Sequence, residues 1–196
     1  MDPIKKADLL KKEADAILRE KGIEAQLRKH AGVHYGGSYA LDLMAWRDID
    51  IYISFHPDPF SLEKLISLEN DLIRMQDVIM AKIAKFMHKR RPEVPEGLFL
   101  GMRVFHGDWK NYWKLDVWAL SPAQIEENQK YIEKIQENLT AEKRNVILRM
   151  KNLLLTSEGR TPVFSSYHVY QAVVFKNLTD EEEIIDYLLD QGVVLK

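Results

Sequence analysis

Apolar residues recur along the chain with two different periods, and each period predicts a different kind of element. Residues 5–21 carry apolar side chains at helical spacing and stop at Gly22, which predicts a first amphipathic helix. Alternation of apolar and polar side chains is typical of half-buried strands. It occurs in four segments: 32–36, 48–55, 98–105 and 112–120.

The rest of the chain has mainly helical spacing. Residues 61–90 predict one long helix or two, and helix-start signals occur at Ser121-Pro122 and Thr140. We therefore expect an α+β fold. Residues 1–120 should form a small mixed β-sheet with flanking helices, and residues 121–196 a C-terminal helical subdomain.

Two carboxylates share one face of the second expected strand. Asp48 and Asp50 flank Ile49, so both acids project to one side while Ile49 enters the core. A third acid, Asp116, lies in the last expected strand on the same face as Lys114. Three converging carboxylates suit Mg²⁺, which prefers oxygen ligands.

Each acid also has a structural alternative. Asp48 and Asp50 could occupy the solvated face of an antiparallel sheet. Asp116 could form an ion pair with Lys114 or with Arg103 across a hairpin. The first alternative explains the alternation but not the glycine turn that precedes the acid-bearing strand.

That turn, Gly36-Gly37-Ser38, follows the first expected strand and should open a helix that runs through Met44. Glycines let backbone N–H groups approach a phosphate closely, and the Ser38 hydroxyl adds a donor. Asp42, one turn along the same helix, should orient the turn. A phosphate cradle would then lie beside the acid pair.

Arg47 immediately precedes the acid-bearing strand. It could reach a bound triphosphate, or it could pair with Asp42 or Asp48. The six histidines lack the spacing of a transition-metal site.

Together these motifs resemble the nucleotidyltransferase superfamily that includes DNA polymerase beta. Its pattern is a glycine-serine turn, an Asp-x-Asp strand and a third acid on a later strand. The matching residues are Gly37, Ser38, Asp48, Asp50 and Asp116. The superfamily more often has a glycine where this chain has Asp42 and a serine where it has Arg47, and this variation looks more like the lincosamide and aminoglycoside nucleotidyltransferases that modify antibiotics.

The resemblance implies a polymerase-beta-like fold over about residues 30–120 and magnesium-dependent nucleotidyl transfer. Asp48 and Asp50 would hold two Mg²⁺ ions, and Asp116 would bind the first ion or accept the acceptor proton. The nucleoside triphosphate, by default ATP, would be bound by four residues: Gly36, Gly37, Ser38 and Arg47. A small hydroxyl-bearing molecule would be the acceptor, and pyrophosphate would leave.

Composition is that of an ordinary enzyme. The net charge of −2 disfavours binding to long nucleic acid. The chain has no cysteine, no apolar run of membrane-spanning length and no signal-peptide core, which predicts a cytoplasmic protein. Two other functions remain open: transfer to a protein or a tRNA, as in toxin and antitoxin pairs, and an inactive nucleotide-binding module. A homodimer is also open, because partner subunits in this family often face the acceptor.

Overall fold

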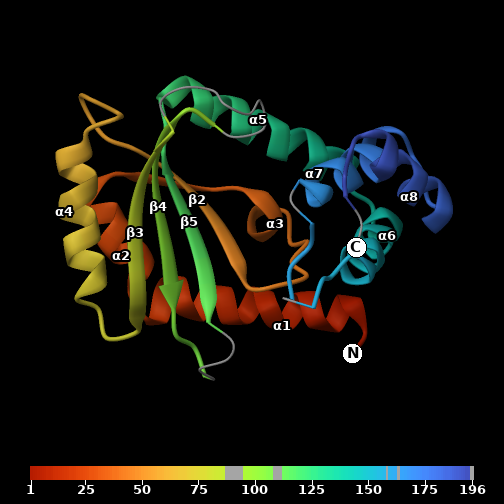
Figure 1. Cartoon of the computed structure of the whole chain (residues 1–196), viewed down its shortest axis with the longest axis horizontal. Helices are drawn as coiled ribbons and strands as arrows, with labels where there is room; N and C mark the ends of the chain where they lie inside the picture. Colours follow the sequence, from red (N-terminus) through yellow and green to blue (C-terminus); the bar gives the residue numbers. More distant parts are fainter. Residues whose placement is uncertain (87–94, 108–111, 158, 163, 195–196) are drawn as a thin grey trace.

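The computed structural model describes residues 1–86, 95–107, 112–157, 159–162 and 164–194. In these residues the core of the fold is a five-stranded sheet with the order β1-β2-β5-β4-β3 (Figure 1). The strands are β1 (Gly32–Tyr35), β2 (Asp48–Ser54), β3 (Val78–Phe86), β4 (Gly97–Val104) and β5 (Trp113–Ala119). β2 and β5 are parallel and the other neighbours are antiparallel, so the sheet is mixed as predicted.

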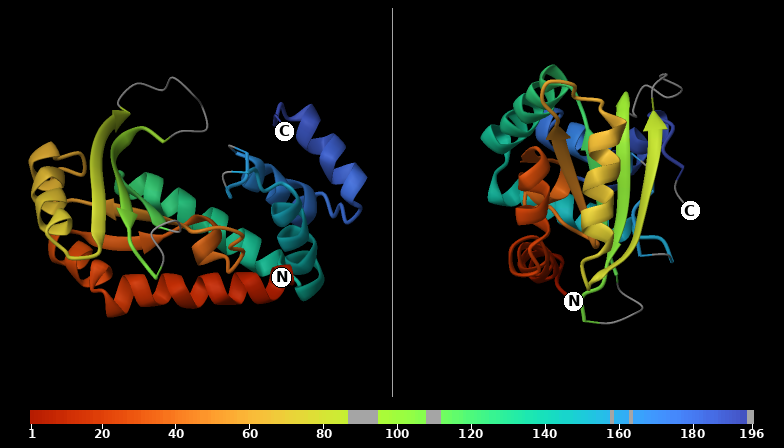
Figure 2. Two further views of the ribbon diagram at one scale, coloured as in Figure 1. Left: turned by 60° about the horizontal axis from the view of Figure 1, so that its bottom comes forward. Right: turned by 90° about the vertical axis from the view of Figure 1, so that its left-hand side faces the viewer.

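Helices surround one face and one end of this sheet. They are α1 (Pro3–Asp15), α2 (Ile23–His30), α3 (Gly37–Ala40), α4 (Leu62–Ile73), α5 (Pro122–Asn138), α6 (Ala141–Leu153), α7 (Ser165–Tyr170) and α8 (Glu181–Asp190). Figure 2 shows that α1, α2 and α4 lie on one side of the sheet. The other face is turned toward the viewer in Figure 1, and α6, α7 and α8 lie beyond its end.

The predicted alternation fixes which face of the sheet is buried. Ile49, Ile51 and Ile53 of β2 are fully buried, as are Leu115 and Val117 of β5. They form one apolar cluster with α1, α2 and α4. The intervening polar side chains therefore occupy the opposite face, which confirms the predicted faces of both strands.

The prediction of one or two helices over residues 61–90 is wrong in its second half. Only α4 is helical, and β3 instead pairs with β4 in antiparallel register. A short apolar run fits either period, and here pairing with β4 decides in favour of the strand. β3 is also an edge strand, and exposed lysines such as Lys82 and Lys85 are typical of edges. Residues 87–90 lie outside the described residues.

The first helix extends over nearly its predicted length. α1 continues as a π-helical segment, Ala16–Glu20, and Gly22 adopts a φ of 76° where α2 begins. In the described residues, no helix is long and apolar enough to cross a bilayer.

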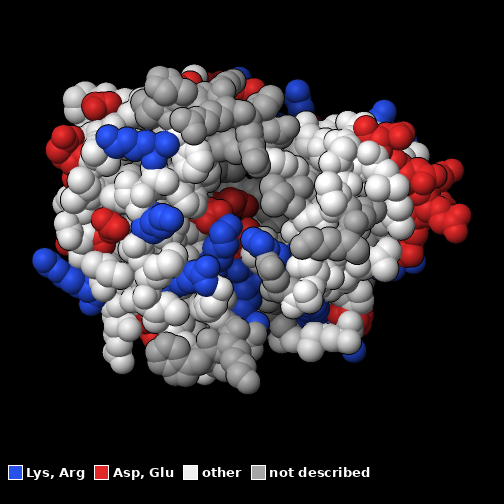
Figure 3. Space-filling model, in the orientation of Figure 1, with Lys and Arg blue, Asp and Glu red and all other residues white. Residues whose placement is uncertain are grey.

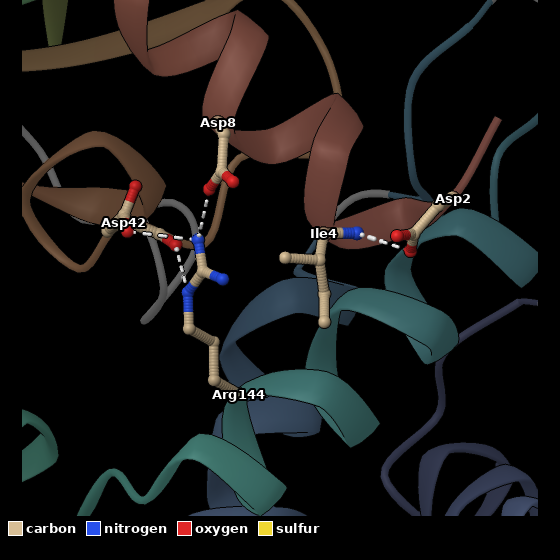
Figure 4. Close-up of polar contacts among 5 residues, drawn as sticks. All are labelled: Asp2, Ile4, Asp8, Asp42 and Arg144. Carbon is tan, nitrogen blue, oxygen red and sulfur yellow. Dashed lines mark hydrogen bonds and ion pairs between the residues drawn. The ribbon is translucent and has the colours of Figure 1, made fainter.

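α1 also joins the sheet to the C-terminal helices. Leu10 and Ala14 belong to the sheet cluster, whereas Ala7 packs in a second apolar cluster with α6, α7 and α8. In Figure 4, the Arg144 side chain of α6 reaches Asp8 of α1 and Asp42, with Nη2 3.0 Å from a carboxylate oxygen of each. The N-terminal helix thus contacts both parts of the molecule.

Candidate active site

The parallel pairing of β2 and β5 brings the three predicted acids together. The register places Asp50 beside Asp116 and Asp48 beside Lys114. All four side chains lie on the face of the sheet that α1, α2 and α4 leave uncovered. Figure 3 shows acidic side chains at the bottom of a hollow in this face, with Lys and Arg side chains around them.

Lys114 lies among these carboxylates. Its Nζ donates to Asp116 Oδ2 at 2.5 Å and to Asp48 Oδ1 at 3.4 Å. The ion pair between Lys114 and Asp116 that the sequence left open is therefore present. Arg103 instead stacks on the Tyr112 ring at 4.3 Å from its centroid.

Burial and mutual repulsion of the three carboxylates raise the free energy of the folded protein when no ligand is bound. Burial, followed by the charge of Asp50, raises the pKa of Asp48 well above its usual value. Burial and the charge of Asp116 raise the pKa of Asp50 to about 6. Burial also works to lower the pKa of Lys114, but the carboxylates of Asp48, Asp116 and Asp50 outweigh it and hold that pKa above its usual value.

The glycine turn touches the acid-bearing strand directly. The Gly36 N–H donates to the Asp50 carbonyl oxygen at 3.0 Å. Gly37 has a φ of 55°, and a Cβ there would lie 2.0 Å from Asp50 Oδ2. A Cβ at Gly36 would lie 2.3 Å from the Tyr52 ring. Only glycine at both positions lets the turn approach the carboxylate this closely.

The helix that follows the turn is shorter than predicted. α3 ends at Ala40, and Asp42 lies outside it with a φ of 56°. The expected helix through Met44 is therefore wrong, and the Leu43 N–H turns back to the Ser38 carbonyl at 2.9 Å. No described residue forms a hydrogen bond with the Ser38 hydroxyl.

Arg47 pairs with neither of its expected partners. Its Nε and Nη2 donate to the Glu13 carboxylate of α1 at 2.9 and 3.2 Å. The same carboxylate accepts the Trp113 indole N–H at 3.2 Å. Since Arg47 precedes Asp48 and Trp113 precedes Lys114, Glu13 holds the start of both acid-bearing strands.

Lys151 of α6 is a charged residue of this region that the sequence reading missed. Its side chain is 1% exposed. Its Nζ donates to the Leu43 carbonyl at 2.6 Å and to the Tyr170 hydroxyl at 3.0 Å. Burial lowers the pKa of Lys151 to about 7, although Asp48 and Asp50 oppose this shift. The sequence did contain a signal for the burial of Lys151. This residue follows the apolar Ile147 and Leu148 at helical spacing, so it lies on the same face of the helix.

The donor set fits a magnesium ion, although the acids are not gathered around one point. Among the described residues, no three acidic or histidine side chains converge as a metal-binding group. The Lys114 ammonium lies between two of the acids instead. The buried Asp116 Oδ1 has no hydrogen-bond partner within the described part of the chain, and both acids of β2 have raised pKa values. Carboxylates with this surplus of negative charge suit a hard cation.

The chain matches no protein-family model and no curated protein. Its fold nevertheless matches solved structures. A cytoplasmic RNA terminal U-transferase aligns with a TM-score of 0.54 at 14% identity, over 86% of this chain and 48% of that one. The Cid1 poly(U) polymerase with Mg and 3′-dATP bound aligns with a TM-score of 0.55 at 15% identity, over 84% of this chain and 48% of that one.

A third match is the non-canonical poly(A) polymerase GLD-2 in complex with GLD-3. Its TM-score is 0.53 at 12% identity, over 89% of this chain and 58% of that one. The chain has a nucleotidyltransferase fold. It spans about half the length of these three structures. The nucleotidyltransferase fold expected from the resemblance is therefore confirmed.

Proposed function

We propose that the protein is a magnesium-dependent nucleotidyltransferase that moves a nucleoside monophosphate from a nucleoside triphosphate to a hydroxyl group. One observation carries the proposal: the glycine turn packs against Asp50, and the parallel pairing of β2 and β5 sets Asp116 beside that same carboxylate. The glycine turn, which we assign to phosphate binding, and the three carboxylates thus lie side by side.

The triphosphate has donors on two sides of this site. The first N–H groups of a helical turn have no partner within the turn, so those of Gly37 and Ser38 are available to a phosphate oxygen. We assign Lys151 to the triphosphate as well, because a buried ammonium without an anionic hydrogen-bond partner is stabilised by one. Gly36 keeps the turn close to β2. Arg47 acts by positioning β2 through Glu13.

Asp48, Asp50 and Asp116 would hold magnesium in place of the Lys114 ammonium. Bound magnesium supplies neutralisation of phosphate charge and a lower pKa for the attacking hydroxyl. The acceptor oxygen forms a bond to the α-phosphorus as the bond from that phosphorus to the β-phosphate oxygen breaks. Pyrophosphate leaves, and we assign Asp116 to take the hydroxyl proton.

The finer expectations from the sequence remain predictions. They are ATP as the nucleotide, a small acceptor of the kind that antibiotic-modifying enzymes use, a cytoplasmic location and an open possibility of a homodimer. The RNA-directed activity in the names of the matched structures belongs to those longer proteins.

Thermal unfolding with each of the four common nucleoside triphosphates, with and without magnesium, tests the proposal. A ligand that binds only the native state raises the melting temperature by mass action. We expect a magnesium-dependent rise with at least one triphosphate, lost in Asp48→Asn and kept in Asp190→Asn, which alters an exposed acid at the end of α8. No rise in the wild-type protein would overturn the proposal.

A further inference from the structure

The segment that follows the glycine turn is held through its backbone carbonyls. Four of them accept hydrogen bonds from side chains of the long helices α1, α5 and α6. The pairs are Lys11 Nζ with Tyr39 at 3.2 Å, Gln136 Nε2 with Ala40 at 3.2 Å, Arg144 Nε with Asp42 at 3.3 Å, and Lys151 Nζ with Leu43 at 2.6 Å. Carbonyls at the end of a helix lack partners within it, so these donors complete the end of the short helix α3.

One face of α6 supplies two of these four donors. Arg144 and Lys151 are seven positions apart, so both lie on the same side of the helix. Between them Ile147 is fully buried in the apolar cluster that also contains Leu43. Two cations of α6 thus hold the consecutive carbonyls of Asp42 and Leu43 on either side of an apolar contact.

Asp42 keeps a backbone conformation that disfavours an aspartate. Its φ of 56° lies in the left-handed region, where a Cβ is strained and glycine is not. The superfamily that the motifs resemble more often has glycine at this position. Here the Asp42 carboxylate Oδ2 accepts a hydrogen bond from Arg144 Nη2 at 3.0 Å, and the same nitrogen reaches Asp8 Oδ1 at 3.0 Å (Figure 4). The pairing with Arg144 accounts for a carboxylate where glycine would fit the backbone better.

The hydrogen bonds continue from Asp42 back to the glycine turn. The Leu43 N–H donates to the Ser38 carbonyl at 2.9 Å, and the Leu41 N–H donates to the Gly37 carbonyl at 3.4 Å. A displacement of residues 42–43 would therefore be passed to the turn that packs against Asp50. α6 thus bears on the turn at Arg144 and carries Lys151 two turns further along.

We propose that Arg144 is a positioning residue for the triphosphate and that it acts through Asp42. The pair fixes the glycine turn relative to α6, so that the turn and Lys151 keep the separation that one triphosphate spans. The inference rests on the proposed function and names two residues that control its triphosphate site. Neither side chain contacts the phosphates itself.

Exposure of the pair separates this role from a contribution to stability. The side chains of Arg144 and Asp42 are 21% and 49% exposed. An ion pair as exposed as this one adds little to the free energy of unfolding, because water screens it. Its removal should therefore change triphosphate binding more than it changes folding.

Arg144→Met tests the inference, with whichever triphosphate stabilises the wild-type protein. We expect the KM for the triphosphate to rise about 10-fold with a smaller change in kcat, since misplaced donors bind the phosphates less well. The magnesium-dependent thermal rise should shrink, and the melting temperature without ligand should change little. Asp8→Asn is the matched control, because it removes the other carboxylate that Arg144 Nη2 contacts. A lower melting temperature with an unchanged KM, or an equal rise of KM in Asp8→Asn, would overturn the inference.

Two substitutions of Asp42 separate its carboxylate from its backbone. Asp42→Gly and Asp42→Ala both remove the carboxylate, but glycine keeps the positive φ without strain. Both variants should raise the KM for the triphosphate as Arg144→Met does, and Asp42→Gly should melt at the higher temperature. A wild-type KM in Asp42→Gly would overturn the inference even if Arg144→Met did not fold.

The two residues should also behave as one unit. In the double variant of Arg144→Met with Asp42→Gly, the KM should rise no further than in either single variant, whereas independent effects would multiply to about 100-fold and overturn the pairing. Arg144→Lys should recover part of the affinity, because an ammonium can still pair with the carboxylate.

Hydrogen exchange without ligand tests the link to the turn directly. The Leu43 N–H should exchange faster in Arg144→Met and Asp42→Gly than in Asp8→Asn, because its bond to Ser38 opens more often. Unchanged exchange would overturn the inference. Absence of a magnesium-dependent thermal rise in the wild-type protein would instead overturn the proposed function, whereas a rise that both variants keep in full would overturn the positioning role alone.

Discussion

Two charged sites lie close together, one partly buried on the sheet and one fully buried on α6, and their charges are unbalanced in opposite directions. The sheet site holds three carboxylates and one ammonium, from Asp48, Asp50, Asp116 and Lys114. The α6 site holds Lys151, whose hydrogen-bond partners are a carbonyl and a neutral hydroxyl. Each site alone costs free energy in the folded protein.

The opposite charge imbalances of the two sites indicate which ligand could bind to both. A magnesium triphosphate carries cations for the sheet site and anionic oxygens for Lys151. A ligand that balances both sites recovers the free energy that their burial costs. We therefore expect changes at the two sites to separate catalysis from triphosphate affinity.

Removing a charge from the sheet site should have the largest effect. In Asp48→Asn we expect transfer to fall by about 10³-fold, because positioned charge is the main source of catalysis at such a site. The melting temperature without ligand should rise, since the amide replaces a buried carboxylate with a raised pKa. Pyrophosphate release and thermal unfolding measure the two effects. Unchanged transfer would remove Asp48 from the site.

The sheet site can also be disturbed without changing its charge. In Gly37→Ala the new Cβ would collide with Asp50 Oδ2, and the positive φ adds strain. We expect a stability loss of about 1–2 kcal/mol and a fall in transfer of about 10²-fold. Gly107→Ala is the matched control, because Gly107 has a φ of 80° but its Cβ would meet no atom within 4 Å. If Gly37→Ala and Gly107→Ala lost transfer activity equally, the loss would be due to reduced stability alone.

Breaking the α6 site should act on affinity. In Lys151→Met we expect the KM for the triphosphate to rise about 10- to 100-fold with a smaller change in kcat, because a charge-assisted contact is worth about 1.5–3 kcal/mol. Steady-state kinetics measure the split, and Arg149→Met, exposed on the same helix, serves as the control. A fall in kcat alone would place Lys151 away from the triphosphate.

Glu13, which positions the strands of the sheet site, should contribute less to the rate of transfer than the charged groups of the site. Glu13→Gln weakens the contacts that hold the starts of β2 and β5, so we expect kcat to fall about 10-fold with little change in KM. Glu20→Gln alters an exposed acid of the neighbouring π-helical segment and should have no effect. A change in triphosphate KM would instead favour direct contact between Arg47 and phosphate.

The smallest expected effect is on the pH dependence of stability, to which the two sites contribute with opposite signs. Asp50 has a folded pKa of about 6 against a usual 3.8, so the folded state binds more protons in that interval and the free energy of unfolding should fall as pH rises through it. Lys151 has a folded pKa of about 7 against a usual 10.5, so the unfolded state binds more protons and stability should rise with pH there.

Urea unfolding across pH, without ligand, measures both slopes. Asp50→Asn should reduce the first slope, to which Asp48 also contributes through its raised pKa, and leave the second, whereas Lys151→Met should flatten the second and leave the first. If either variant flattened both slopes, the two sites would not be separable.

The sequence predicted the elements whose pattern is local. Alternation around Ile49 and Leu115 identified the strands and the faces of the acids. β3 was missed because a short apolar run fits two periods, and its pairing with β4 is a tertiary choice. The length of α3 was overestimated because no local sequence pattern predicts the positive φ of Asp42.

For the candidate site, too, the sequence predicted the residues with a local pattern and missed those defined by tertiary contacts. Asp48, Asp50 and Asp116 were predicted as site residues because their spacing follows a known pattern, and the strand register sets them side by side. Glu13 and Lys151 were not, because each takes its role from partners about a hundred positions away, such as Trp113 and Leu43. Single-sequence patterns carry no information about such contacts, and the pairing of Arg47 with Glu13 was missed for the same reason.

The position of α1 has a consequence for unfolding. Because Ala7 packs with the C-terminal helices and Leu10 packs with the sheet, neither part can lose its core without exposing apolar surface of this one helix. The proposed division at Ser121 therefore separates regions of the chain that we expect to melt together, in a single cooperative transition. Deletion of the first helix should destabilise the most distant helices as much as the sheet.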